Sequence, residues 1–174
     1  MENLPAHAKA ICHGIRNGAE LKYFKNYLVV EIIGTEISPT ATRFSDTIQW
    51  DFHDVKKEWE NSFDFIYSNS FDHSYNPEHC IQQWMSCLKK DGACFLEHSL
   101  SDVKASKLDP FGATFHGMHK LINYAGKGLF HVSRILTPQI DPNKDFRKAT
   151  WGELPSVVYY VVQYRKKRPD QSVA

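Results

Sequence analysis

The order in which apolar runs and amphipathic stretches follow one another constrains this chain most. Two stretches with helical periodicity, residues 17–27 and 77–88, separate short runs of β-compatible residues. These runs cover residues 8–12, 31–37, 47–52, 63–69 and 93–97. Strands that alternate with helices at this spacing predict an α/β fold, with a mostly parallel sheet and helices on both faces.

The last third of the chain has a different pattern. Residues 101–117 are polar and contain Pro110, and we expect a long loop there, followed by a short helix over 116–124. Two further apolar runs, 129–136 and 157–164, are separated by a polar segment with three prolines. Because a helix does not fit that segment, we expect these two strands to pair antiparallel and to close the sheet.

Length and composition exclude several classes of protein. The 174 residues suit one domain, residues 1–174, with a core at about 8–166. A formal net charge of +1 argues against a dedicated nucleic-acid or anionic-membrane binder. We expect no membrane span, because no apolar stretch approaches about 18 residues. The four cysteines form no C-x-x-C pair, which favours a cytoplasmic protein.

The residues that follow the first two strands indicate a ligand site. Ligands of open parallel sheets bind beyond the carboxyl ends of the strands. The first strand runs into C-H-G-I-R-N-G, in which Gly14 and Gly18 permit a tight turn before the helix N-terminus. Glu36 ends the second strand, 18 positions after Gly18, which is close to the spacing of an acid that binds ribose hydroxyls. Together these features predict a nucleoside pocket.

Two cofactor classes use such a pocket. The dinucleotide fingerprint G-x-G-x-x-G/A would take Gly14, Arg16 and Ala19, and the Arg16 side chain would obstruct the backbone approach to a pyrophosphate. A G-x-G-x-G pattern would take Gly14, Arg16 and Gly18, so that two of three glycines are present. The second pattern favours a cofactor without a pyrophosphate.

Residues 63–99 decide between the two classes. Their apolar strand, their loop with Phe71-Asp72-His73 and their helix ending in Leu-Lys-Lys-Asp-Gly resemble the fourth-to-fifth strand unit of class I S-adenosylmethionine-dependent methyltransferases. The resemblance extends over about residues 8–166, because that family also ends in an antiparallel strand. It implies a Rossmann-like three-layer sandwich, a seven-stranded sheet with the last strand antiparallel, and S-adenosylmethionine as the cofactor.

The resemblance also implies a role for individual residues. His13, Gly14, Arg16, Asn17 and Gly18 would lie against the methionine part of the cofactor. The other implied contacts are Glu36 with the ribose, Ile37 and Phe52 with the adenine ring, Asp51 with the adenine amino group, and Ser68, Asn69, Ser70 and His73 around the sulfonium and the mouth of the pocket.

Two positions depart from the family pattern. Cys12 stands where the family usually has an acid that helps hold the cofactor's amino group, and Arg16 replaces the middle glycine. These departures leave three hypotheses open. The first is methyl transfer to a small-molecule or glycan-like acceptor. The second is a non-catalytic binding or regulatory domain, and the third, disfavoured by Arg16, is an NAD-dependent oxidoreductase.

The remaining expectations concern catalysis and assembly. Asp72, His73 and His98 are the candidates for a general base. His116 and His119 lack an H-E-x-x-H pattern, and we predict no metal site. Only about seven residues precede the first strand, which predicts an open cofactor site. A lid would then come from residues 101–117, from the loop before Val157, or from a partner subunit such as the second copy in a homodimer.

Overall fold

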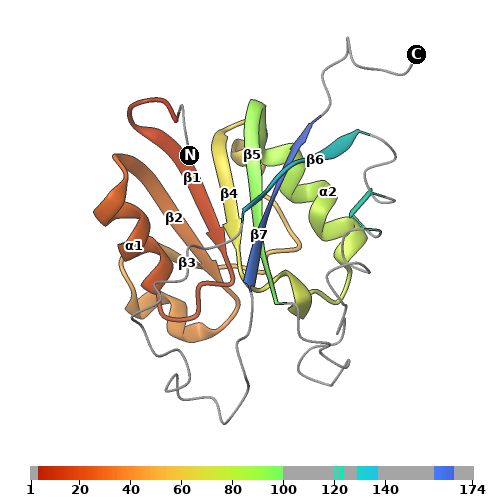
Figure 1. Ribbon diagram of the computed structural model, residues 1–174. Helices are drawn as coiled ribbons and strands as arrows, with labels where there is room; N and C mark the ends of the chain where they lie inside the picture. The colour runs from red at the N-terminus through yellow and green to blue at the C-terminus, as the bar shows by residue number, and fades with distance from the viewer. Residues whose placement is uncertain (1–3, 100–119, 121, 124–128, 137–158, 167–174) are drawn as a thin grey trace, which may run out of the picture.

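The computed structural model describes residues 4–99, 120, 122–123, 129–136 and 159–166. Within this part of the chain, seven strands form one sheet in the order β3-β2-β1-β4-β5-β7-β6 (Figure 1). The strands are β1 (Ala8–His13), β2 (Val30–Glu36), β3 (Thr47–Gln49), β4 (Phe63–Ser68), β5 (Leu88–Ser99), β6 (Phe130–Leu136) and β7 (Tyr159–Lys166). The helices are α1 (Ala19–Tyr27) and α2 (Pro77–Cys87), with short 3-10 helices η1 (Pro39–Arg43), η2 (Lys57–Trp59) and η3 (Phe71–His73).

The strand directions confirm the predicted sheet. Strands β1 to β5 pair in parallel, whereas β7 runs antiparallel to both β5 and β6. Strand β1 lies between β2 and β4, so the chain order changes direction at the β1–β4 boundary. In an open α/β sheet, such a switch point opens a crevice at the carboxyl edge of the strands.

Two apolar cores lie on opposite faces of the sheet. Consecutive residues of β1 alternate between them, because side chains of a strand point to opposite faces. Ala10 and Cys12 pack with Leu21 of α1, whereas Ile11 packs with Trp84 of α2. The described helices therefore cover both faces of the sheet, as the three-layer prediction requires.

The helix ends have local causes. Gly18 precedes α1 with a φ of 73°, a left-handed conformation that glycine adopts at little cost. Asn76 caps α2, since its Oδ1 accepts a hydrogen bond from the backbone N–H of His79 at 3.3 Å, and Pro77 follows at the first helical position. The predicted boundaries of both helices agree with the structure to within two residues.

Two predicted strand boundaries were wrong. Strand β3 ends at Gln49, and the next residues turn back as the Trp50 side-chain N–H donates to the Asp54 carbonyl at 2.8 Å. Strand β5 begins at Leu88, directly after α2, and Gly92 lies inside it instead of ending a connection. A backbone irregularity between Phe63 and Phe65 of β4 accommodates this early start.

Several predictions fall outside the described residues. The expected loop over 101–117, the segment before Val157 and most of the expected helix over 116–124 belong to that part of the chain. Within the last segment, residues 120, 122 and 123 are described and helical, and Ile122 is buried in the core on the α2 face.

Candidate functional site

The carboxyl ends of four parallel strands meet at one edge of the sheet (Figure 1). The register aligns His13 of β1 with Thr35 of β2 and Ser68 of β4, and it aligns Glu36 with Gln49 of β3. The fold therefore brings the glycine-containing loop, the acid of β2, the loop after β3 and the loop after β4 to the same edge.

The loop after β1 is fixed by its backbone. The N–H groups of Gly14 and Ile15 both donate to the Thr35 carbonyl, at 2.9 and 3.2 Å. Gly14 has a φ of 71°, and a Cβ at this position would lie 2.6 Å from the Cβ of Ser70. The Ser70 hydroxyl donates to the Gly14 carbonyl at 3.0 Å. Gly14 thus permits the loop after β4 to approach the loop after β1 closely.

Arg16 occupies a left-handed conformation, with a φ of 46°. For a residue with a side chain this conformation costs roughly 1–2 kcal/mol. The Arg16 side chain is exposed, and its backbone N–H donates to the Glu36 Oε2 at 2.9 Å. The residue that replaces the family glycine therefore keeps the turn and helps to orient the acid of β2.

Glu36 is half-buried, and its carboxylate is held from two sides. In addition to the contact with Arg16, its Oε1 accepts from the backbone N–H of Ser38 at 2.9 Å. A carboxylate has about four acceptor positions, two on each oxygen. With these two donors alone among the described residues, each Glu36 oxygen keeps one acceptor position for a ligand, an arrangement that fits the two adjacent hydroxyls of a ribose.

Ile37 directly follows Glu36, and Asp51 and Phe52 belong to the loop after β3, in which the Phe52 ring packs on Trp84. Ile37 follows β2 with a side chain that is 63% exposed, although it is large and apolar. The Asp51 carboxylate contacts Tyr75 and also His53, a residue that sequence analysis did not identify. Partial burial alone would raise the pKa of Asp51. The hydrogen bonds from the His53 backbone and ring and from the Tyr75 hydroxyl outweigh that effect and lower the pKa.

The side chains of two predicted cofactor residues point into the protein. The His13 ring is 1% exposed and stacks on Trp84, with ring centroids 4.5 Å apart. Burial lowers the pKa of His13 to about 3. The hydroxyl of Ser68 donates to the His13 carbonyl at 2.9 Å and accepts from the Ser70 N–H at 3.0 Å. His13 and Ser68 shape the edge through the backbone rather than by presenting side chains there.

Cys12 is fully buried, and a carboxylate from another element lies beside it. Burial and the charge of Glu20 raise the pKa of the Cys12 thiol well above its usual value. Glu20 belongs to the first turn of α1, and its Oε1 accepts from the Asn69 amide at 3.1 Å. Its Oε2 is buried and has no hydrogen-bond partner among the described residues. Sequence analysis did not identify Glu20, because only the packing of α1 brings it to the ends of β1 and β4.

The candidate general bases come from two elements. Asp72 is half-buried and His73 is exposed, and both belong to η3, which directly follows Ser70. His98 lies in β5 and pairs with Tyr160 of β7, but its side chain lies outside what the structure describes. Asn17 and Asn69 are exposed at the same edge.

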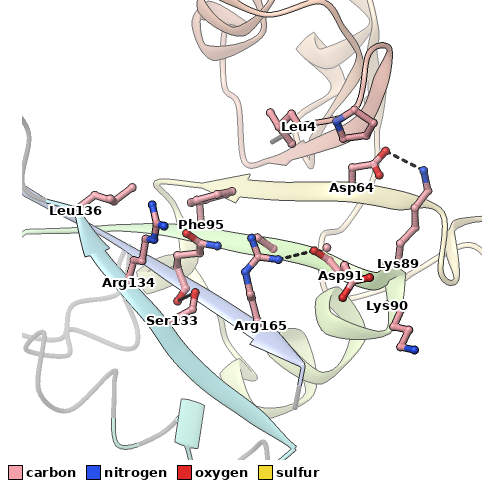
Figure 2. Close-up of a pocket in the computed structure, with 14 residues that line it drawn as sticks. Leu4, Asp64, Lys89, Lys90, Asp91, Phe95, Ser133, Arg134, Leu136 and Arg165 are labelled. Atoms are coloured by element: carbon pink, nitrogen blue, oxygen red, sulfur yellow. Dashed lines mark hydrogen bonds and ion pairs between the residues drawn. The ribbon is translucent and has the colours of Figure 1, made fainter. Parts of the chain in front are cut away.

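Two hollows elsewhere on the described surface have other linings. One, of about 470 Å³, lies over β5, β7 and β6 (Figure 2). Its lining includes Ala93 and Phe95, which belong to the same core cluster as Leu21 of α1. Its wall includes the Lys89–Asp64 ion pair and Arg165, which donates to the Asp91 carbonyl at 2.5 Å. The other, of about 430 Å³, is lined by β1 and β2 near their amino ends. Neither is lined by Gly14, Glu36 or Asp51.

The described residues contain no group of three or more metal-ligating side chains close enough to hold an ion. Of the helices in the described ranges, none is long and apolar enough to cross a membrane.

Known proteins share this fold. The methyltransferase-domain family profile matches residues 11–96, which run from β1 into β5 and include the whole candidate edge. No curated protein sequence is significantly similar to the chain.

Three solved structures illustrate the structural likeness. A chain in the complex of the Haloferax volcanii Trm112 methyltransferase activator with a methyltransferase has a TM-score of 0.72 at 15% identity, covering 95% of this chain and 84% of that one. The Burkholderia thailandensis 1,6-didemethyltoxoflavin-N1-methyltransferase, solved with bound 1,6-didemethyltoxoflavin and S-adenosylhomocysteine, has a TM-score of 0.63 at 15% identity, covering 92% of this chain and 71% of that one. The [4+2]-cyclase SpnF has a TM-score of 0.62 at 15% identity, covering 77% and 54%.

The seven-stranded topology with one antiparallel strand defines a Rossmann-like methyltransferase fold. The family profile and the fold are consistent with a class I S-adenosylmethionine-dependent methyltransferase, and they support S-adenosylmethionine as the cofactor of this domain. The residues at the edge fit this cofactor, because Glu36 keeps two acceptor positions for a diol and Ile37 offers exposed apolar surface beside it.

Proposed function

We propose that this chain catalyses methyl transfer from S-adenosylmethionine to a small-molecule or glycan-like acceptor at the carboxyl edge of β1, β2 and β4. The observation that carries the proposal is the Glu36 carboxylate. Two backbone N–H groups fix it at 2.9 Å each, and one acceptor position per oxygen stays available. Such pre-orientation of a charged acceptor favours binding of adjacent ribose hydroxyls.

The chain's own residues would hold and orient the reactants. Glu36 binds the ribose, Asp51 and Ile37 contact the adenine, and the loop Gly14–Gly18 faces the methionine part. The Glu20 carboxylate, which lies beside Cys12, would accept from the methionine ammonium once its side chain turns toward the ligand, and would so take over the role of the acid that Cys12 replaces. Asn17, Asn69, Ser70 and His73 complete the site.

When bound, the cofactor supplies a methyl group already activated by a sulfonium. The protein's task is alignment of the acceptor, which can contribute roughly 7–11 kcal/mol. Asp72, His73 or His98 would take the proton of an acceptor that carries one, an effect worth about 10²–10⁴-fold in rate. Arg16, exposed beside the glycines, is available to pair with a carboxylate of cofactor or acceptor.

The cellular setting is part of the proposal. We propose one domain over residues 1–174 that works in the cytoplasm, because all four cysteines are free and buried. The proposed acceptor is neither a nucleic acid nor a lipid surface, and a second copy of the chain is the proposed partner if a lid is needed. The Trm112 complex is an example of a related fold that has an activator protein.

Substitution of Glu36 by Gln tests the proposal. We expect the affinity for S-adenosylhomocysteine, measured by isothermal titration calorimetry, to fall by about 10- to 100-fold, because a hydrogen bond to a charged group is worth about 1.5–3 kcal/mol. Glu31→Gln is the matched control, since Glu31 is an exposed residue of the same strand, and its affinity should equal that of the wild type.

Two results would count against the proposal. If Glu36→Gln binds as tightly as the wild type, Glu36 does not bind the ribose. If the wild type binds S-adenosylmethionine but methylates no acceptor in a broad panel, the non-catalytic alternative is favoured. The relation to SpnF, a cyclase, illustrates that a shared fold does not fix the reaction.

A further inference from the structure

The Asp51 carboxylate is held from three directions. Its Oδ1 accepts from the backbone N–H of His53 at 3.0 Å and lies 2.7 Å from the His53 Nδ1. Its Oδ2 accepts from the Tyr75 hydroxyl at 3.0 Å. These contacts use three of the four acceptor positions of the carboxylate. Among the described residues no further donor contacts Oδ2, which leaves one position on it for a ligand, and the Asp51 side chain is 28% exposed, so a ligand can reach it.

The partners of His53 determine its tautomer. An aspartate is ionised at neutral pH, and the donors around Asp51 lower its pKa further, so its carboxylate only accepts and the His53 Nδ1 beside it carries a proton. The other ring nitrogen lies 2.7 Å from the Ser74 hydroxyl and 3.4 Å from the Asn76 backbone N–H. Because a backbone N–H only donates, that nitrogen is an acceptor. Each contact of the ring thus has one donor and one acceptor.

His53 connects Asp51 to the start of α2. Ser74 is buried, and Asn76 is the residue that caps the helix. The next loop residue is tied to the same helix, because the Trp84 side-chain N–H donates to the Phe52 carbonyl at 2.7 Å. Tyr75 covers His53 from the outside, with ring centroids 3.6 Å apart. The buried imidazole therefore fixes the orientation of a carboxylate at the ligand edge.

We propose that His53, assisted by Tyr75, is a positioning residue that makes Asp51 selective for the exocyclic amino group of adenine. The inference rests on the proposed function, in which Asp51 faces the adenine. With one acceptor position and no proton to donate, the fixed carboxylate binds an amino group, whereas it opposes the oxo group of a hypoxanthine. A carboxylate free to rotate would lose part of this discrimination.

The test compares S-adenosylhomocysteine with its hypoxanthine counterpart, S-inosylhomocysteine, by calorimetry. We expect the wild type to prefer the adenine compound by about 10- to 100-fold, the range for a ligand group that leaves a charged acceptor unsatisfied. His53→Phe should reduce this ratio to less than about 5-fold, because it removes the donor to Oδ1. His53→Asn should keep most of it, since the Asn amide can donate from the Nδ1 position.

Two comparisons keep the inference falsifiable. His53→Gln carries its amide toward Ser74 instead of Asp51, so it should lose the discrimination that His53→Asn keeps, even if His53→Phe does not fold. His7→Asn is a control, because His7 is exposed at the opposite edge, before β1. Its ratio should equal that of the wild type.

The outcomes separate the inference from the proposed function. If the wild type binds neither compound, the proposed function fails together with the inference. If the wild type binds both compounds with equal affinity, Asp51 does not recognise the exocyclic amino group of adenine. If the wild type discriminates and the Asn, Gln and folded Phe variants all keep the same ratio, the positioning role of His53 is wrong, while the proposed function stands.

Discussion

At the scale of single residues, the candidate site depends on a neutral histidine directly beside its first glycine. His13 has no access to solvent, its Nδ1 lies 2.8 Å from the Thr35 hydroxyl, and its other ring nitrogen has no partner among the described residues. Burial disfavours the charged imidazolium, so the pKa falls from its usual 6.5 to about 3.

The buried imidazole predicts a pH dependence of stability. Between about pH 6.5 and pH 3 the unfolded chain binds a proton at His13 that the folded chain does not bind. The contribution of His13 is therefore fully present above pH 6.5 and is lost as the pH falls, by about 1.4 kcal/mol per pH unit. We expect His13→Asn to show a shallower decrease in the free energy of unfolding between pH 6.5 and pH 4. Parallel decreases in urea titrations would contradict a neutral His13.

A second prediction concerns Gly14. Gly14→Ala would place a methyl group against Ser70, on a backbone with positive φ. Strain and overpacking should lower the free energy of unfolding by about 2–4 kcal/mol. Chemical denaturation measures this change. The double variant Gly14→Ala/Ser70→Gly should regain the part of the free energy of unfolding that is lost through overpacking. If it regains none, a reason other than the close approach of the two loops requires glycine at position 14.

Single residues also mark the limit of sequence interpretation. Gly14, Gly18 and Glu36 were predicted because local spacing alone identifies strand ends and turns. Glu20 and His53 were not predicted, because their partners are remote in sequence. Glu20 contacts Asn69 across 49 positions, and His53 contacts Ser74 across 21. No local pattern contains such contacts, which exist only after the helices have packed on the sheet.

At the scale of elements, the loop after β1 is held against β2 by shape. Ile15 is buried in this loop, and a Cβ on Gly34 of β2 would lie 2.2 Å from its Cδ1. The strand therefore needs a residue without a side chain at the position where the loop crosses it. The packing of Ile15 on Gly34 therefore sets how closely the loop after β1 lies against β2 at the candidate site.

Gly34→Ala should lower the free energy of unfolding by about 1–3 kcal/mol, the usual cost of overpacking. Ile15→Val removes the atom that would be closest. The double variant should therefore be more stable than the sum of the two single effects predicts, as measured by a double-mutant cycle. Strict additivity would show that the two side chains do not compete for the same space.

Element boundaries were predicted less well than element types. The end of β3 depends on side chains that pull the chain into a turn, and the start of β5 depends on pairing with β4. Neither the side-chain hydrogen bond nor the strand pairing can be predicted from a run of apolar residues in the sequence. The buried face of α2 was predicted correctly. Ile81, Trp84 and Met85 recur at helical spacing in the sequence, and all three are buried in the structure.

At the scale of the whole molecule, the packing of the helices on the sheet buries all four thiols of the chain. Cys12, Cys80, Cys87 and Cys94 are free and buried, and burial raises the pKa of each, that of Cys87 to about 11. We expect Ellman's reagent to label no thiol of the native protein at pH 8 within minutes and to label four after denaturation. Rapid labelling of a native thiol would show that one of the cores opens locally.

The most direct test of the central claim is a calorimetric titration of the wild-type chain with S-adenosylmethionine, S-adenosylhomocysteine and NADH in parallel. Glu36 and the carboxyl edge of the parallel strands predict that both sulfur-containing compounds bind at one site per chain, with micromolar or tighter affinity, and that NADH does not compete. Binding of NADH alone, or binding of S-adenosylhomocysteine that is unchanged in Glu36→Gln, would contradict the claim that this edge is a methyltransferase cofactor site.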